Sequence, residues 1–477
     1  MTFTPRRFNL EDGRPAHLAL DTPWSKPEIS KALGVSAVGK EAILTREEAA
    51  DLVAYAAAEK AKGRIPADWL SLMHLGTSLH IMGDTQAGLD YCRAAVALHR
   101  TAPTLLALAV ILETSGHFDE ALELAEEAVR EDKTNQFAGL QWAQGILRTG
   151  DWARGWPPFE WFSWGHLWEG ELAQQYVPGW NGEPLKGKRI IVIQGGGFGD
   201  NIMFFRWFQN LKEMGAHITY CCPEMLAPLF EFHPWVDEII PVKEGPETGD
   251  LPEFMPVLGR LLHEGFDPDH VLAIKQAYND GMDIMEICKA YGAKWEPKYD
   301  YFVPIMGLAR RCNATVENMR WDGPYIQNPE WSFPWRKRKK VGVCWAGAEK
   351  LDPRRHRSLN SEQAKKLLSV DKVEWVNLQY GVEPPVPIEC PKINSWRDTL
   401  SIINELDLVV TVDTGVMHLA GAMGKPTWVM LPSLSDWKFL KDRTDMVFYP
   451  SVRLFRNGEG REGLDFALAQ VIEALNG

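Results

Sequence analysis

The chain has 477 residues, which is too long for one hydrophobic core and predicts roughly three domains of about 150 residues each. Its formal net charge of −13 argues against general nucleic-acid binding, because nucleic acids are bound through positively charged surfaces. The seven cysteines are scattered and form no Cys-x-x-Cys pair, which excludes the spacing of a zinc site and is typical of a reducing compartment.

The first 20 residues contain no apolar core of signal-peptide length, and no run approaches the roughly 20 apolar residues of a membrane span. From this we expect a cytoplasmic protein without a membrane span. Residues 1–44 show no sustained periodicity and are interpreted as an N-terminal arm.

Residues 45–170 are predicted to form an all-helical repeat module. Similar segments begin at Gly83, Gly116 and Gly150, so the repeat has periods of 33 and 34 residues. This is the spacing of tetratricopeptide repeats, and residues 101–135 resemble such a unit closely. A non-repeating helical bundle is the alternative. Such an array would bind a protein partner or, being short, would mediate self-association or packing.

Residues 171–335 alternate strands and helices and follow a tryptophan-rich junction. A buried strand at 189–193 leads into a glycine-rich loop and then an apolar helix at 202–211. The loop matches neither the dinucleotide-binding fingerprint nor a P-loop, but it lets a ligand approach the backbone. Asp200, at the end of this loop, either acts chemically or only caps the helix. Further strands are predicted at 217–221 and 238–241, and further helices at 224–230, 252–262 and 281–291.

Residues 336–477 are predicted to form a second α/β domain, which begins with a basic run at 336–340. Strands at 341–345 and 375–379 alternate with helices at 361–368 and 396–405, and an amphipathic helix at 464–475 ends the chain. The loop after the first strand is rich in arginine, whose planar guanidinium can bind two phosphate oxygens at once. A solvated surface loop is the alternative. The loop's arginines are Arg354, Arg355 and Arg357.

The most informative stretch is residues 407–431, DLVVTVDTGVMHLAGAMGKPTWVML. It is predicted as a strand at 408–412, a turn at Asp413-Thr414-Gly415, a helix at 416–423 and a strand at 427–431. The turn would lie where a strand ends and a helix begins, which is where open α/β sheets bind phosphorylated ligands. In the alternative interpretation Asp413 and Thr414 only cap the helix.

Several motifs now occur in one order: GGGFGDNIMFFRW at 195–207, VGVCWAG…RRHRSL at 341–359, LQYG at 378–381, the 407–431 stretch with its following DW, and YPSVRLFR at 449–456. Together they resemble bacterial tetratricopeptide-repeat glycosyltransferases related to the heptosyltransferases. The layout is also distantly similar to that of protein O-linked N-acetylglucosamine transferases. The resemblance implies a GT-B fold, in which two Rossmann-like domains face each other across a cleft, with the acceptor mainly on the first and the nucleotide-sugar donor mainly on the second.

The resemblance also implies roles for particular residues. Asp200 matches the general base that takes the proton of the acceptor hydroxyl. The resemblance implies a donor and phosphate-binding set as well, in which Arg355 and Arg357 would neutralise the leaving diphosphate, so that no metal or other cofactor is expected. The backbone amides at the helix start, with Thr414, would hold the diphosphate, and Asp413 or His418 would contact the sugar. That set is Gly199, Arg355, Arg357, Asp413, Thr414, Gly415 and His418. Trp345 and Gln379 lie at predicted strand ends, where nucleotide contacts would fall.

The sequence departs from the family pattern at Gln194, Ala348 and Arg354, which leaves the donor's identity open. The function predicted is metal-independent, inverting transfer of a sugar from a nucleotide diphosphate sugar to a hydroxyl of a protein or a surface saccharide. Two alternatives stay open. One is a non-catalytic repeat scaffold that binds a nucleotide sugar, and the other is a sugar-nucleotide epimerase on a similar fold.

Overall fold

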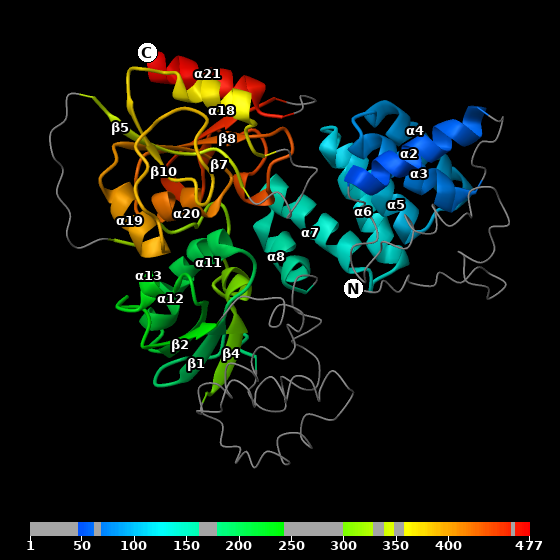
Figure 1. Ribbon diagram of the computed structural model, residues 1–477. Helices are drawn as coiled ribbons and strands as arrows, with labels where there is room; N and C mark the ends of the chain where they lie inside the picture. The colour runs from blue at the N-terminus through cyan, green and yellow to red at the C-terminus, as the bar shows by residue number, and fades with distance from the viewer. Residues whose placement is uncertain are drawn as a thin grey trace, which may run out of the picture.

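The computed structural model describes residues 46–61, 68–161, 179–242, 299–327, 338–347, 357–458 and 463–477. Figure 1 shows three parts: a helical module at one side and two α/β units stacked beside it. The predicted arm at 1–44, the helices predicted at 252–262 and 281–291, and the three predicted domain boundaries lie outside the described residues. The boundaries therefore stay predictions.

The helical module consists of successive helices that pack on their neighbours as hairpins (Figure 1). The second helix of each hairpin follows one of the repeated glycines, and all three glycines have positive φ angles, which glycine adopts without strain. The repeated pattern therefore marks the turn inside each hairpin. Assignment to the tetratricopeptide family stays a prediction. The helices are α2 (Arg46–Ala61), α3 (Trp69–Ile81), α4 (Thr85–Leu98), α5 (Ala102–Thr114), α6 (Phe118–Glu131), α7 (Gln136–Thr149) and α8 (Trp152–Glu160).

The first α/β unit contains a parallel sheet with the strand order β3-β2-β1-β4. Its strands are β1 (Arg189–Ile193), β2 (His217–Pro223), β3 (Glu238–Val242) and β4 (Tyr301–Pro304). The helix predicted at 202–211 was placed wrongly. It begins four residues earlier, as α11 (Phe198–Phe204), and a 3-10 turn, η3 (Phe205–Trp207), separates it from α12 (Phe208–Glu213). The prediction started the helix too late because the glycine-rich residues before it are typical of a loop. The other helical segments are α13 (Ala227–Phe230), η5 (Ile305–Gly307) and α17 (Leu308–Arg311).

The second α/β unit contains a larger sheet with the order β6-β5-β7-β8-β10-β9, parallel except for the short edge strand β9. The strands of residues 408–412 and 427–431 lie where predicted, whereas β10 coincides with a motif to which no structure had been assigned. The strands are β5 (Lys340–Cys344), β6 (Glu374–Asn377), β7 (Leu408–Val412), β8 (Thr427–Leu431), β9 (Asp445–Met446) and β10 (Tyr449–Arg456). The helical segments are α18 (Ser361–Leu368), α19 (Trp396–Asn404), α20 (Gly415–Ala422), η7 (Trp437–Phe439) and α21 (Asp465–Asn476).

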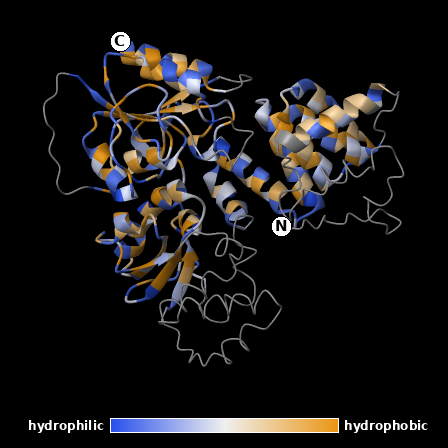
Figure 2. Ribbon diagram, in the orientation of Figure 1, coloured by the Kyte–Doolittle hydropathy of each residue, from blue (hydrophilic) through white to orange (hydrophobic). Residues whose placement is uncertain are grey.

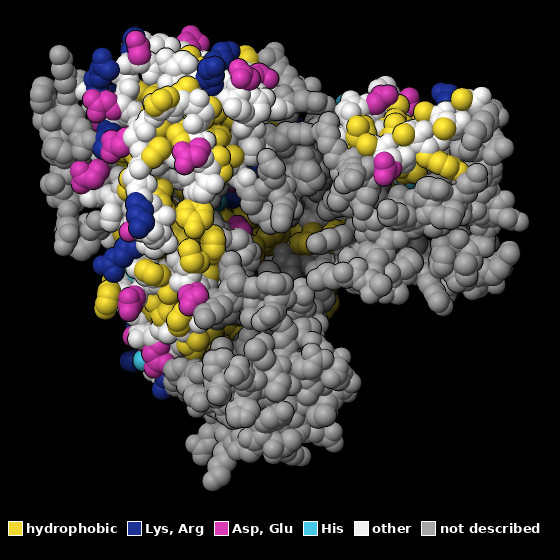
Figure 3. Space-filling model, viewed as in Figure 1, with side chains coloured by type: hydrophobic (Ala, Val, Ile, Leu, Met, Phe, Trp, Pro, Cys, Tyr) yellow, Lys and Arg dark blue, Asp and Glu magenta, His cyan; other side chains and the backbone are white. Residues whose placement is uncertain are grey.

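The three parts share a hydrophobic core. One cluster of buried side chains runs from α7 and α8 through the first sheet into the second, and Figure 2 shows the apolar strands of the first sheet that belong to it. On the face in Figure 3, acidic and basic side chains lie next to one another over the second α/β unit. No helix among the described residues combines the length and the apolarity that a membrane crossing requires. The predicted order of parts, a helical region followed by two α/β units, is confirmed.

Candidate functional site

The two predicted ligand loops meet across the boundary between the α/β units, where α11 packs on α20. At the centre of this contact Gly199 lies against the ring of His418, and a Cβ atom placed on Gly199 would be 2.6 Å from His418 Cδ2. A larger residue at 199 would therefore separate the two helices. The glycine predicted to admit a phosphate serves here to admit a neighbouring helix.

Asp200 follows immediately and is half-buried. Its Oδ2 accepts a hydrogen bond of 2.8 Å from the Gly197 N–H, so the capping interpretation is correct as far as it goes. Burial raises the pKa of this carboxyl, and the nearby Asp436 and Asp413 raise it further, while Lys438 and the Gly197 N–H lower it. Three of these groups belong to the second α/β unit, so Asp200 faces across the boundary.

A buried group of charges lies opposite Asp200. Asp413, at the end of β7, is 5% exposed, and Lys438, in η7, is 6% exposed. Lys438 Nζ lies 3.4 Å from Asp413 Oδ1 and 3.4 Å from Asp436 Oδ2, and Arg357 Nη1 lies 3.7 Å from Asp413 Oδ2. Sequence reasoning missed Lys438, although it directly follows the DW pair that carried part of the resemblance. A lone lysine has no spacing signal, so only the fold brings it to Asp413.

Thr414 occupies the N-cap position of α20, but its side chain makes no capping bond. Its hydroxyl lies 3.2 Å from Thr411 Oγ1 and donates to Cys344 Sγ at 3.8 Å. The interpretation that Thr414 only caps the helix is therefore wrong, and the amides that begin α20 are not used by this side chain. Gly415 lies against Trp396, because a Cβ atom on it would be 2.6 Å from that indole.

His418 is 2% exposed, and its Nδ1 lies 3.1 Å from the Tyr449 hydroxyl. That hydroxyl is 3.3 Å from the hydroxyl of Tyr325, which donates to the Ile202 carbonyl at 3.1 Å. Burial holds the pKa of His418 well below its usual value, and the neighbouring Lys438 lowers it further, so the imidazole is neutral. The network joins α20, β10 and α11, which gives His418 a clear structural role.

The remaining predicted residues are Trp345, Gln379 and Arg355, and no contact described here joins them to Asp200 or Asp413. Trp345 is 5% exposed and packs in the core of the second sheet, away from solvent. Gln379 Oε1 accepts from the Ala346 N–H at 2.9 Å, which ties the end of β5 to the residues after β6. Arg355 lies outside the described residues. The nucleotide contacts of Trp345 and Gln379 and the diphosphate contact of Arg355 stay predictions.

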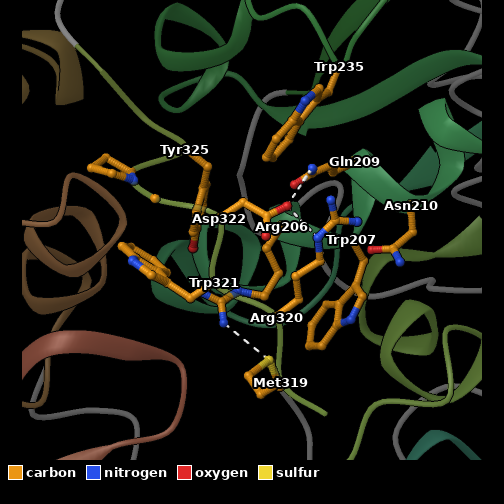
Figure 4. A pocket seen from close by; sticks show the side chains of 12 residues that line it. Arg206, Trp207, Gln209, Asn210, Trp235, Met319, Arg320, Trp321, Asp322 and Tyr325 are labelled. Carbon is orange, nitrogen blue, oxygen red and sulfur yellow. Dashed lines mark hydrogen bonds and ion pairs between the residues drawn. The ribbon is translucent and has the colours of Figure 1, made fainter.

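A separate pocket of about 230 Å³ opens beside α12, beyond the end of α11 that faces away from Asp200. Figure 4 shows its aromatic walls, Trp235, Trp321 and Tyr325, around the buried Arg206. The Arg206 guanidinium lies 5.2 Å from the Tyr449 ring centroid and donates to the Phe448 carbonyl at 2.5 Å. Arg206 thus joins the first α/β unit to the β10 end of the second unit, next to the tyrosine that contacts His418. None of the predicted site residues lines this pocket.

Comparison with known families gives a match that overlaps the 407–431 stretch. Residues 390–430 match the family model described as "Glycosyltransferase family 9 (heptosyltransferase)". The predicted resemblance to the heptosyltransferase family is confirmed. The match supports the enzyme class glycosyltransferase, and it covers β7, α20 and most of β8, where Asp413, Thr414 and His418 lie.

The chain is 24% identical over 371 residues to Protein FlbA of Caulobacter vibrioides, which covers 71% of this chain and 56% of FlbA. The chain thus spans little more than half the length of this curated relative.

Similar solved structures include a glycosyl transferase family 9 protein of Veillonella parvula, with 15% identity, coverage of 62% of this chain and 98% of that one, and a TM-score of 0.40. The heptosyltransferase WaaC of E. coli with ADP has 13% identity, coverage of 60% and 99%, and a TM-score of 0.36. An O-GlcNAc transferase mutant of Thermobaculum terrenum has 14% identity, coverage of 94% and 93%, and a TM-score of 0.28.

Proposed function

We propose that this chain is an inverting glycosyltransferase that moves a sugar from a nucleotide diphosphate sugar to an acceptor hydroxyl. The observation that supports it most is the placement of Asp200, on the first α/β unit, opposite the Asp413 turn and its cations on the second. A base on one side, and cations at a turn that begins a helix on the other, are what a single displacement at a sugar carbon needs.

In this reaction Asp200 accepts the proton of the acceptor hydroxyl as its oxygen attacks the anomeric carbon. The bond between that carbon and the diphosphate oxygen breaks at the same time, and the diphosphate leaves with the electron pair. One displacement inverts the configuration of the carbon. Because the pKa of Asp200 is raised, its carboxylate is a stronger base than an exposed aspartate while it is still ionised.

The leaving diphosphate gains negative charge, and we infer that the second α/β unit neutralises it without a metal ion. Arg357 and Lys438 bring two positive charges to the turn, and the first amides of α20 point their partial positive charge the same way. Arg355 is proposed to join them. Asp413 or His418 would contact the sugar, with Asp413 nearer to the cations and His418 beneath Gly199.

The acceptor in this proposal is a hydroxyl of a protein or of a bacterial surface saccharide, handled in the cytoplasm. The helical module would bind a protein partner or pair two copies of the chain. A non-catalytic scaffold that binds a nucleotide sugar is the second candidate. It is favoured by one observation, the use of Asp200 Oδ2 as a cap for the Gly197 N–H.

The deciding experiment begins with a thermal-shift panel of nucleotides and nucleotide sugars, with and without magnesium, because a ligand of the folded state raises the melting temperature with its concentration. The stabilising donor is then used in a transfer assay with the wild-type chain and with Asp200→Asn. Transfer by the wild type that Asp200→Asn abolishes, with donor binding kept, supports the enzyme. Donor binding with no transfer by either chain supports the scaffold, and donor isomerisation without an acceptor supports the epimerase.

A further inference from the structure

Trp437 links the helical module to the turn that carries Lys438. Trp437, the first residue of η7, is 4% exposed, and its ring is surrounded by aromatic rings of α8. Its ring centroid lies 5.2 Å from that of Trp156, 5.4 Å from that of Phe159 and 6.3 Å from that of Trp152. Figure 1 shows α8 between the rest of the helical module and the α/β units. Aromatic packing of this kind fixes ring positions.

The chain on both sides of η7 is also tied to the end of α7. The Arg148 carbonyl accepts from the Lys441 N–H at 3.2 Å, and Arg148 Nη2 donates to the Ser435 carbonyl at 3.4 Å. Arg148 itself is buried and pairs with Glu113 of α5. The position of η7 is therefore determined by α7 and α8, and not only by the sheet that it follows in sequence.

The residue after Trp437 is Lys438, whose ammonium lies between Asp413 and Asp436. The two residues share a single turn, so a displacement of the Trp437 ring displaces the start of the Lys438 side chain. Resting on the proposed function, we propose that α8 of the helical module positions Lys438 to bind the donor's diphosphate, with Trp437 as the connecting residue. The module is then part of the donor site, beyond any role in binding a partner.

Lys438 is suited to this task because it is buried beside the first turn of α20 and already faces acidic groups on both sides. An entering diphosphate would add a third anionic neighbour to the ammonium, at the helix end that attracts anions. Lys438 would touch the ligand, whereas Trp437 and Trp156 would act only through Lys438. A loosened η7 would therefore weaken diphosphate binding without removing any group that touches the donor.

A double-mutant cycle tests this. ADP, GDP, UDP and dTDP are titrated calorimetrically into the full chain and into Lys438→Met, Trp156→Leu and the double variant. Each single change is expected to weaken binding about tenfold, which is about 1.4 kcal/mol, because Lys438→Met removes the ammonium and Trp156→Leu displaces it. Because Trp156 acts through Lys438, Trp156→Leu is expected to have little further effect in the K438M background.

Controls separate positioning from general damage. Lys441→Ala changes an exposed side chain where the chain after η7 meets the end of α7, and it should leave nucleotide binding unchanged. Trp437→Phe keeps an aromatic ring and should retain most of the nucleotide affinity. Near-ultraviolet circular dichroism checks folding, and Phe159→Leu replaces Trp156→Leu if the latter does not fold. The inference is overturned, with the proposed function left standing, if Trp156→Leu weakens nucleotide binding equally in the wild-type and Lys438→Met backgrounds. It is also overturned if Trp156→Leu leaves nucleotide binding unchanged. No binding of any nucleotide by the wild type overturns the proposed function and the inference with it.

Discussion

The two strand–turn–helix loops of this protein share a geometry but differ in their charge. After β1, the first turn of α11 carries one acid, Asp200, whose carboxylate accepts from the Gly197 N–H. After β7, the turn carries Asp413, which is held between Arg357 and Lys438. The same backbone arrangement therefore carries a single carboxylate on one side and a group of paired charges on the other, which we propose to act as the proton acceptor and the diphosphate site. The chemistry of each loop comes from the residues that the fold brings to it, and not from the loop alone.

The largest effect is expected from removing the acid of the first loop. Asp200→Asn keeps the size of the side chain and an oxygen for the Gly197 N–H, but it cannot accept the acceptor's proton. The transfer rate should fall about a hundredfold to ten-thousandfold, with little change in donor affinity. Steady-state kinetics and calorimetry measure the two quantities. Asp322→Asn, an exposed acid outside the loops, serves as the control. An unchanged rate would remove Asp200 as the base.

The second loop should respond to the same kind of change with a loss of stability. Asp413→Asn leaves Arg357 and the buried Lys438 with one anionic partner fewer, so the free energy of unfolding should fall by about 1–3 kcal/mol. Urea denaturation measures it. In the control Glu213→Gln, the exposed pair with Arg320 is broken, and the loss should stay below about 1 kcal/mol. Equal losses in both variants would show that the buried charges are not coupled as described.

The contact between the loops can be tested at Gly199. A Cβ atom there would overlap the His418 ring, so Gly199→Ala should lower the free energy of unfolding by about 1–3 kcal/mol. Gly197→Ala is a matched control two residues earlier. Its Cβ would lie 3.6 Å from Asp200 Oδ2, in ordinary contact. Differential scanning calorimetry of the two variants compares them, and equal melting temperatures would contradict the close approach of α11 and α20.

The smallest effect is expected in the pH profile. The base must be ionised, so kcat/KM should fall as the pH drops through the pKa of Asp200, which lies above that of an exposed aspartate. Among the described residues, Lys438, Asp436 and Asp413 shift the Asp200 pKa from the second α/β unit, and Asp200 in turn raises the pKa of Tyr449. Of these, Lys438 lowers the Asp200 pKa, so Lys438→Met should move the acidic limb to higher pH. A limb that stays in place would show that Lys438 does not act on this carboxylate.

Local sequence patterns predicted the helices and strands correctly where these depend on residues close together in the chain. The β-branched run at 408–412, the turn after it and the helix up to Gly424 lie where apolar runs and turn residues placed them. The same patterns failed at Phe198, because a glycine-rich stretch predicts a loop while Asp200 caps a helix inside it. They also gave β10 no assignment, although its motif contributed to the family resemblance.

The sequence by itself determined the alternation of strands and helices, the 33–34-residue helical period and the family resemblance, because each depends on residues near one another along the chain. Only the tertiary structure decided that Gly199 meets His418, that Lys438 meets Asp413 and that Trp437 packs on α8. The reason is physical. Burial and pairing of charges depend on distances in space between separate units, and a pattern of neighbouring residues does not contain those distances.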